Sequence, residues 1–165
     1  MWSYLLNMET DYRIINFDLG VSGSYTGSNK VFGGTISLLP SDSRVQSGKI
    51  HSLSVMFSGS AFSGNIDLII SSDLPTPGVV GSTYTASFSD LKNIISSISL
   101  IGTSSLGTNY AVIGPHTHAT VNNINVPFNS DSVYLTSIYQ NTSNAVFPSG
   151  SVWATVGYEL GESRG

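Results

Sequence analysis

The residues of this chain with the clearest chemical potential are two histidines separated by a single residue. His116 and His118 lie in the stretch GPHTHAT, residues 114–120. If this stretch is a β-strand, both imidazoles project from one face, because strand residues two apart point the same way. Gly114 and Pro115 precede the pair, so a loop is an equally good interpretation. The pair is therefore compatible with a metal clip, a catalytic pair or a packed part of an interface.

A metal site is poorly supported by the rest of the sequence. Two imidazoles do not complete a zinc site, which takes four protein ligands or three plus water. The third histidine, His51, is distant in sequence, and no HExxH motif is present. Three such pairs around a threefold axis would supply six nitrogens, but that symmetry is not readable from one chain. We expect no metal ion and no cofactor, and interpret His116 and His118 as interface or sheet-rim residues with ordinary hydrogen bonds.

Sequence motifs for catalysis are missing. There is no GxSxG elbow to expose a serine nucleophile, and no GxGxxG or phosphate-binding loop. The chain has no cysteine, which excludes thiol catalysis and disulfides. The acidic residues lie mostly beside turns or at solvent-facing strand positions, as Asp67 does between Ile66 and Leu68. We expect no enzymatic activity and no catalytic residue.

The composition limits the partners of the protein. Charged residues make up 10% of the chain and the formal net charge is −4, whereas a typical domain has about a quarter charged residues. No basic patch is present, so we expect no nucleic-acid partner. The apolar runs are strand-sized and no signal peptide is recognisable, so we expect a soluble protein without membrane contact. So little charge suggests that much of the surface is held against other molecules.

Alternating apolar and polar residues predict a protein built from β-strands. The predicted strands cover residues 13–19, 31–39, 49–58, 64–71, 83–88, 122–128, 132–140 and 151–160. Turn-forming residues separate them, which predicts an all-β, two-sheet antiparallel sandwich, with a jelly roll as the leading connectivity and another Greek-key order as the alternative. In the last strand the alternation turns Trp153 away from the core.

One stretch departs from the two-residue period. In SFSDLKNIISSISL, residues 87–100, four apolar residues follow helical spacing: Leu91, Ile94, Ile95 and Ile98. This spacing predicts one short helix near residues 90–99, capped by Ser89 or Asp90. A strand is the alternative, because isoleucine favours strands.

The chain divides into an N-terminal arm, residues 1–12, and a single sandwich domain, residues 13–165. The arm carries Trp2, Tyr4, Leu5 and Leu6 without a clear period. Contact with a neighbouring subunit and packing on the chain's own domain are equally good interpretations of this arm. These four residues, with His116 and His118, form our set of candidate interface residues. A second set could stack on sugar rings: Trp153, Tyr134, Tyr25 and Tyr84.

Four segments in fixed order carry a resemblance to a known group of proteins. They are GSYTGSNKVFGGTISLLP (23–40), RVQSGKIHSLSVMFSGSAFSGNIDLIISSDLPTP (44–77), SFSDLKNIISSISL (87–100) and NINVPFNSDSVYLTSIYQNTSNAVFPSGSVWATVGYEL (123–160). In strand order and loop type, roughly residues 20 to 160 resemble small β-sandwich virion proteins of tailed bacteriophages.

The resemblance implies a structural role on a phage particle. Such proteins commonly act as head decoration, or cement, proteins that clamp neighbouring major capsid subunits, often as homotrimers. It thus implies the major capsid protein and further copies of this chain as partners, and a location on the capsid surface after assembly in the host cytoplasm. No site residue is carried over, because the group shares no site motif that matches here. A receptor- or carbohydrate-binding module of a fibre, or a tail or neck component, is the alternative.

Overall fold

The computed structural model describes residues 11–39, 45–59, 64–100, 108–121, 124–141 and 144–162, and these are mostly strands. The strands are β1 (Asp11–Asp18), β2 (Gly23–Tyr25), β3 (Lys30–Val31), β4 (Ile36–Ser37), β5 (Val45–Ser58), β6 (Ile66–Ser71), β7 (Ile94–Leu100), β8 (Thr108–Ile113), β9 (His116–Val121), β10 (Val126–Phe128), β11 (Tyr134–Tyr139), β12 (Ala145–Phe147) and β13 (Val152–Glu162). One short helix, α1 (Phe88–Lys92), precedes β7. In these ranges, no helix is long and apolar enough to cross a membrane.

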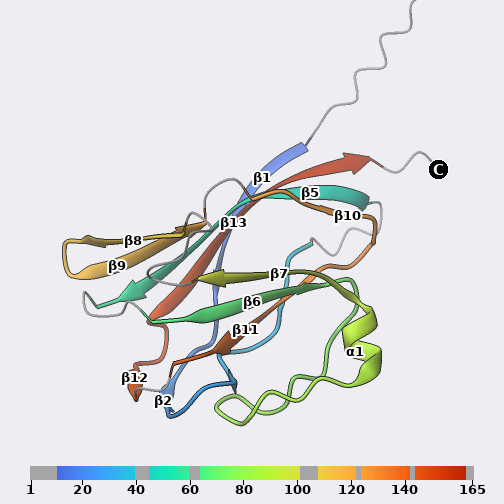
Figure 1. Ribbon diagram of the computed structural model, residues 1–165. Coiled ribbons are helices and arrows are strands. Elements are labelled where there is room, and N and C mark those ends of the chain that lie inside the picture. The colour runs from blue at the N-terminus through green and yellow to red at the C-terminus, as the bar shows by residue number, and fades with distance from the viewer. Residues whose placement is uncertain are drawn as a thin grey trace, which may run out of the picture.

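Two antiparallel sheets stack on each other (Figure 1). The long sheet has the order β1-β13-β5-β9-β8, and β10 pairs with the first part of β5. The short sheet has the order β3-β11-β6-β7, and β4 also pairs with β11. A two-stranded ribbon of β2 and β12 lies at one end. The predicted all-β, two-sheet antiparallel sandwich is confirmed; its jelly-roll connectivity stays a prediction.

The core lies between the sheets and follows the predicted alternation. Leu53, Val55 and Phe57 of β5 are buried, and so are Ile66, Leu68 and Ile70 of β6 and alternate residues of β13; β11 departs from the pattern, because its five residues from Leu135 to Tyr139 are all buried. Each sheet therefore turns one face inward. Asp67 points away from the core, as expected, and accepts hydrogen bonds from Ser99 Oγ at 2.5 Å and Gln140 Nε2 at 2.9 Å.

A cluster of aromatic rings fills the end of the sandwich nearest β2 and β12. Tyr25 and Phe32 meet edge to face with ring centroids 5.0 Å apart, and Phe32 and Phe147 do so at 5.1 Å. Tyr139 contacts the same three rings. Edge-to-face contacts of this kind stabilise beyond the area they bury. Burial also raises the pKa of the Tyr25 phenol.

The helix predicted near residues 90–99 is wrong over most of its length. The structure has a helix at Phe88–Lys92, and Ile94–Leu100 forms a strand against β6. Ile70 pairs with Ser96 and Ser71 with Ile94, so Ile95 is an extra residue at a β-bulge. The bulge breaks the two-residue period and lets Ile95 and Ile98 both pack on the core. The three-residue interval between these two isoleucines resembles the spacing of one helix face.

The predicted helix cap is also corrected. Ser87, and neither Ser89 nor Asp90, is the N-cap residue. Its hydroxyl accepts from the Asp90 N–H at 3.0 Å, and the Asp90 carboxylate accepts from the Ser87 N–H at 2.8 Å. This reciprocal pair is a capping box.

Two predicted strands differ from the structure. The strand expected over residues 31–39 is split into β3 and β4 around Gly33, whose φ of 80° favours glycine. A side chain at Gly33 would collide with the carbonyl of Leu19. The strand expected over residues 83–88 is absent: Thr83 makes a single bridge to Lys30, and Phe88 begins the helix.

Four of the strands were not predicted as such: β2, β7, β8 and β12. The stretch containing the histidine pair, which the sequence left open between loop and strand, is strand β9. Strand β1 begins at Asp11, inside the range assigned to the arm. Trp2, Tyr4, Leu5 and Leu6 lie outside the described residues.

Candidate interaction surface

The histidine pair lies on the outer side of the long sheet. On β9, Thr117 and Ala119 point inward and are buried, so His116 and His118 project outward together. The Nδ1 atom of His118 is 3.0 Å from the hydroxyl of Thr120. His116 is exposed and His118 is half-buried on this side; their role as interface or sheet-rim residues stays a prediction.

No metal ligand set surrounds the pair within the described part of the chain. Among those residues, no three or more His, Cys, Asp or Glu side chains group closely enough to hold an ion. Two imidazoles leave a zinc or copper site incomplete. A metal bound here would need ligands beyond those that the described residues supply.

Strand pairing places residues from five strands in one row across this surface. Asp18 of β1 is opposite Trp153 of β13, Trp153 is opposite Met56 of β5, and Met56 is opposite His118. The row ends at Ala111 of β8. We call this the Trp153 row. Its members are separated by up to 135 residues in sequence, yet neighbours across a sheet are about 5 Å apart.

The centre of the Trp153 row is apolar and partly open to solvent. Met56 is 47% exposed and Trp153 is 40% exposed. The indole Nε1 of Trp153 donates to the Gly150 carbonyl at 3.0 Å, and this intramolecular hydrogen bond orients the ring. Asp18 accepts from the Gly20 N–H at 2.9 Å. The tryptophan thus presents a fixed apolar ring beside one carboxylate.

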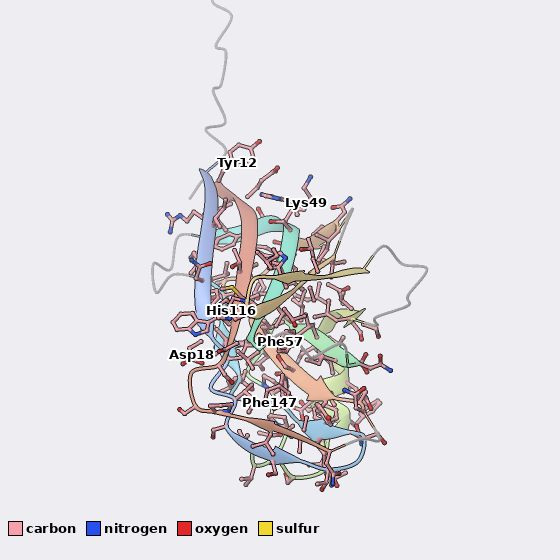
Figure 2. All side chains as sticks on the ribbon, turned by 90° about the vertical axis from the view of Figure 1, so that its left-hand side faces the viewer. Tyr12, Asp18, Lys49, Phe57, His116 and Phe147 are labelled. Atoms are coloured by element: carbon pink, nitrogen blue, oxygen red, sulfur yellow. The ribbon has the colours of Figure 1, made fainter. Side chains whose placement is uncertain are left out.

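The apolar character extends beyond the row in both directions. Ile113, opposite His116, is 62% exposed, and Ile14 on edge strand β1 is 75% exposed. The outer face of the long sheet, as we use the term, comprises Tyr12, Ile14, Asn16, Asp18, Ser52, Ser54, Met56, Ser58, Ala111, Ile113, His116, His118, Thr120, Trp153 and Thr155. Figure 2 shows Tyr12 and Asp18 at the two ends of β1, with His116 near the level of Asp18. Exposed apolar side chains that gather on one face are typical of contact surfaces, so we take the outer face as the candidate interaction surface.

A band of hydroxyls and amides crosses the middle of the outer face. Asn16, Thr155, Ser54 and Thr120 follow each other across four strands. The Thr155 hydroxyl donates to Asn16 Oδ1 at 2.6 Å. The outer face therefore offers apolar contact at both ends and hydrogen bonds between them.

A hollow of about 230 Å³ opens where the outer face meets β12. It is lined by Phe57, Ser58, Gly59, Ala145, Val146, Phe147 and Pro148. Ser58 is opposite His116, and Thr117 donates to the Gly59 carbonyl at 2.7 Å, so the hollow adjoins the histidine pair. Its size suits one large apolar side chain of a partner.

A second exposed apolar region lies in the segment that joins β6 to β7, residues 72–93. We call it the 72–93 segment; it follows the lower right of Figure 1 around α1. Its exposed apolar side chains are Leu74, Val79, Val80, Phe88 and Leu91. The helix buries none of its residues. The conformation of the helix is therefore not explained by packing of its side chains into the core.

The Asp90 carboxylate organises the 72–93 segment. It accepts from the Ser87 hydroxyl at 2.8 Å and from the Thr76 hydroxyl at 3.0 Å, besides the Ser87 N–H. Hydrogen bonds from the Ser87 backbone and hydroxyl lower the pKa of Asp90. Burial, and then the Asp90 charge, raise the pKa of Tyr84. The Ser72 N–H closes the base of the segment on the Asn93 carbonyl at 2.8 Å.

The residues predicted to stack on sugar rings are not equally available. Tyr25 is buried in the aromatic cluster, so that part of the prediction is wrong. Tyr84 and Tyr134 are half-buried. Trp153 alone among the four is exposed. Sequence reasoning missed Met56, Ile14 and Ile113, because only strand pairing shows that they accompany Trp153 and the histidines.

Comparisons with known proteins leave the family open. No protein-family model and no curated protein matches this chain. Among solved structures, a chain from the crystal structure of tomato aspermy virus is similar, with 11% identity and a TM-score of 0.44 over 94% of this chain and 79% of that one. A superposition this loose carries neither fold nor function over to this protein.

Proposed function

We propose that this protein is a structural component of a virus particle, and specifically a head decoration protein of a tailed bacteriophage. The observation that carries the proposal is the outer face of the long sheet. That face carries Asp18 as its one acidic side chain, and it exposes Trp153, Met56, Ile14 and Ile113. The resemblance of residues 20 to 160 to phage virion sandwiches supports the same role. The protein acts by contact and has no catalytic step.

The mechanism is burial of surface across the boundaries between capsid subunits. A specific interface buries about 1,000 Å² or more in total. The outer face spans five strands, and its hollow beside His116 admits an anchoring side chain from the major capsid protein. A homotrimer holds three such faces together, which strengthens attachment through multivalency. The particle then resists the outward pressure of packaged DNA.

The test compares virions that carry different variants of the protein. Met56→Asp places a charge in the Trp153 row, and we expect it to lower occupancy on heads by about tenfold or more. Val79→Asp, in the 72–93 segment, is the matched control, because Val79 is 77% exposed and outside the outer face. Heads depleted of the protein release DNA at lower temperature than complete heads. Equal occupancy of both variants and the wild type would contradict the proposal.

A binding module of a fibre is the second candidate, and the Trp153 row favours it. A fixed, exposed indole beside the Asp18 carboxylate is an arrangement that also suits a sugar ring. This candidate predicts measurable glycan binding by the isolated protein, lost in Trp153→Ala and kept in Val79→Asp. The decoration role predicts none. Copy number per virion separates the two, and also separates a tail or neck component, because heads carry many more copies than tails or fibres.

A further inference from the structure

We infer that β1 of one copy of this chain pairs antiparallel with β1 of a second copy, so that two long sheets join edge to edge across a twofold axis. The pairing uses the backbone at the rim of the long sheet and leaves the outer face open to a partner. It is a twofold contact, separate from the homotrimer of the proposed function, and it does not depend on that function.

The first observation is the direction of the backbone groups of β1. The Leu19 N–H donates to the Val152 carbonyl at 3.0 Å, which continues the register of β1 with β13 by one residue. In an antiparallel pair, residues that bond to the neighbouring strand alternate with residues that face away from it. The odd-numbered residues of β1 therefore bond to β13. The N–H and C=O groups that point to the open edge are those of Tyr12, Ile14, Asn16 and Asp18.

The second observation is that this edge is long and unprotected. In the part of the chain that the structure describes, β13 is the only strand paired with β1, which lies at the margin of the long sheet (Figure 2). The register runs without a shift from Asp11 to Asp18, and β1 contains no proline and no lysine. Proteins commonly protect an edge from pairing with a bulge, a proline or a lysine. β1 has none of these devices.

The edges of the short sheet are built differently. β3 has two residues, and the 72–93 segment continues the sheet beyond it. The Val31 N–H donates to the Ser82 carbonyl at 2.9 Å, and the Gly81 N–H donates to the Val31 carbonyl at 2.8 Å. β7, at the other edge, has the bulge at Ile95. Both edges of the short sheet are thus covered or irregular, whereas β1 is regular and open.

The third observation is that β1 is complementary to itself. The open backbone groups of two β1 strands bond to each other only when even-numbered residues lie opposite even-numbered residues. One such register is centred on Ile15. Its facing pairs are Ile15 with Ile15, Ile14 with Asn16, Arg13 with Phe17 and Tyr12 with Asp18. No pair brings like charges together, and a phenol donor lies opposite a carboxylate acceptor, so the cross-strand contacts are favourable.

The register shifted by two residues is less favourable. It brings Ile14 opposite Ile14 but places the Arg13 guanidinium opposite Ile15, where an aliphatic side chain offers a charge no partner. We therefore take the register centred on Ile15. Because one copy has a single β1, this contact joins two molecules. It uses the same patch on both sides and closes at two copies.

The absence of cysteine makes a direct test available. In the register centred on Ile15, the two Ile15 residues form a non-hydrogen-bonded pair with Cα atoms about 4.5 Å apart, within the range of a disulfide. Ile15→Cys should therefore give a disulfide-linked dimer on mild oxidation. Ile98→Cys is the matched control, because Ile98 is also a half-buried isoleucine that packs against the core from an edge strand. It should stay uncross-linked.

A proline at the open edge is the second test. Ile14→Pro removes an N–H that points away from β13, and edge strands accept proline at such positions. Ile14→Thr is its control, because threonine keeps the N–H and suits a strand. Light scattering should give the wild type and Ile14→Thr equal masses, and Ile14→Pro half that mass. The Ile15→Cys cross-link tests the contact even if Ile14→Pro fails to fold.

The outcomes separate this contact from its alternatives. Failure of Ile15→Cys to cross-link, or equal masses for all three proteins, would overturn the inference. Filaments of wild-type protein would also overturn it, because they would indicate β1 pairing with the opposite edge, β8, of the next copy. A monomeric wild type whose occupancy on heads falls in Ile14→Pro would assign β1 to a strand of the capsid partner and refute self-pairing. Head occupancy of Met56→Asp is measured separately, so the proposed function stands or falls without this contact.

Discussion

The outer face of the long sheet and the 72–93 segment both expose large apolar side chains, but they are held in place by different forces. On the outer face, backbone hydrogen bonds between strands fix the positions of Trp153, Met56 and His118. In the 72–93 segment, side-chain hydrogen bonds to one carboxylate, Asp90, fix the loop around a helix that buries nothing. Disrupting the outer face requires unfolding of the sandwich. Disrupting the 72–93 segment requires only the loss of its local hydrogen bonds.

Because of this difference, the two regions should lose different amounts of conformational freedom when a partner binds. A surface built on a sheet loses little conformational freedom when a partner covers it, so its apolar area converts efficiently into affinity. We expect the 72–93 segment to open more readily, because exposed side-chain hydrogen bonds hold it and its helix buries no residue. This is why the proposed function places the partner contact on the outer face. The predictions below test the contrast, from the largest expected effect to the smallest.

Removing a core ring should damage the outer face and the sandwich together. Phe147 is buried among Tyr25, Phe32 and Tyr139 and forms part of the hollow beside β12. Phe147→Ala should lower the free energy of unfolding by about 3–5 kcal/mol, measured by urea denaturation. Val146→Ala is the control. Val146 is the preceding residue and its side chain is exposed, so the free energy of unfolding should change by no more than about 0.5 kcal/mol. Similar losses in both variants would show that the ring cluster does not support this end.

Removing the helix cap should loosen the 72–93 segment alone. Ser87→Ala deletes the hydroxyl that accepts from the Asp90 N–H, a change that typically costs about 1 kcal/mol of local helix stability. Amide exchange in residues 85–92 should become about fivefold faster, while exchange in β5 and β9 stays the same. Global melting should change little. If β5 and β9 loosened equally, the two regions would be one cooperative unit and the contrast would fail.

Lowering the pH should act on the same segment. Hydrogen bonds from Ser87 lower the pKa of Asp90 below its ordinary value of 3.8. The stabilisation is therefore complete above the unfolded pKa and is lost as the pH falls through the lower folded pKa. Exchange of the Thr76 and Ser87 amides should be constant from pH 7 to pH 5, after correction for intrinsic rates, and should accelerate below about pH 4. In Asp90→Asn this acceleration should be missing; its persistence there would assign the effect to another group.

Changing the tryptophan to phenylalanine should have the smallest effect. Trp153→Phe removes the Nε1–H donor to the Gly150 carbonyl but keeps an aromatic ring in the row. A solvent-accessible hydrogen bond of this kind contributes about 0.5–1 kcal/mol, so the melting temperature should fall by a few degrees at most. Trp153→Ala is the companion variant, and it should weaken binding of a partner more than Trp153→Phe does. Equal binding by both variants would mean that the ring is not a contact.

Much of the sandwich was predictable because burial follows side-chain parity along a strand. Val152, Ala154 and Val156 alternate with the exposed Trp153 and the half-buried Thr155, and all three are buried, as is Tyr158 beyond Gly157. The prediction failed where the backbone departs from a regular strand: the bulge at Ile95 was taken for a helix, and the split at Gly33 was taken for one strand. Neither irregularity has a local signature strong enough to outweigh apolar periodicity.

The candidate surface was predictable only in part. His116 and His118 were identified from their spacing as candidate interface residues, and Trp153 from its parity as a ring turned away from the core that could stack on sugars; all three are on the outer face. Met56, Ile14 and Ile113 look like ordinary apolar residues of strands until the partners of those strands are known. The 72–93 segment was missed as an apolar surface, because nothing local distinguishes an exposed leucine or valine from a buried one.

The amino-acid sequence by itself determined which side of each regular strand is apolar and that the protein is a charge-poor β-sandwich. This information is local, because the pleat of a strand sends alternate side chains to opposite faces. Tertiary structure alone decided that Asp18, Trp153, Met56 and His118 stand in one row. That row depends on which strands pair and in what register, which is settled by long-range packing across more than a hundred residues of chain.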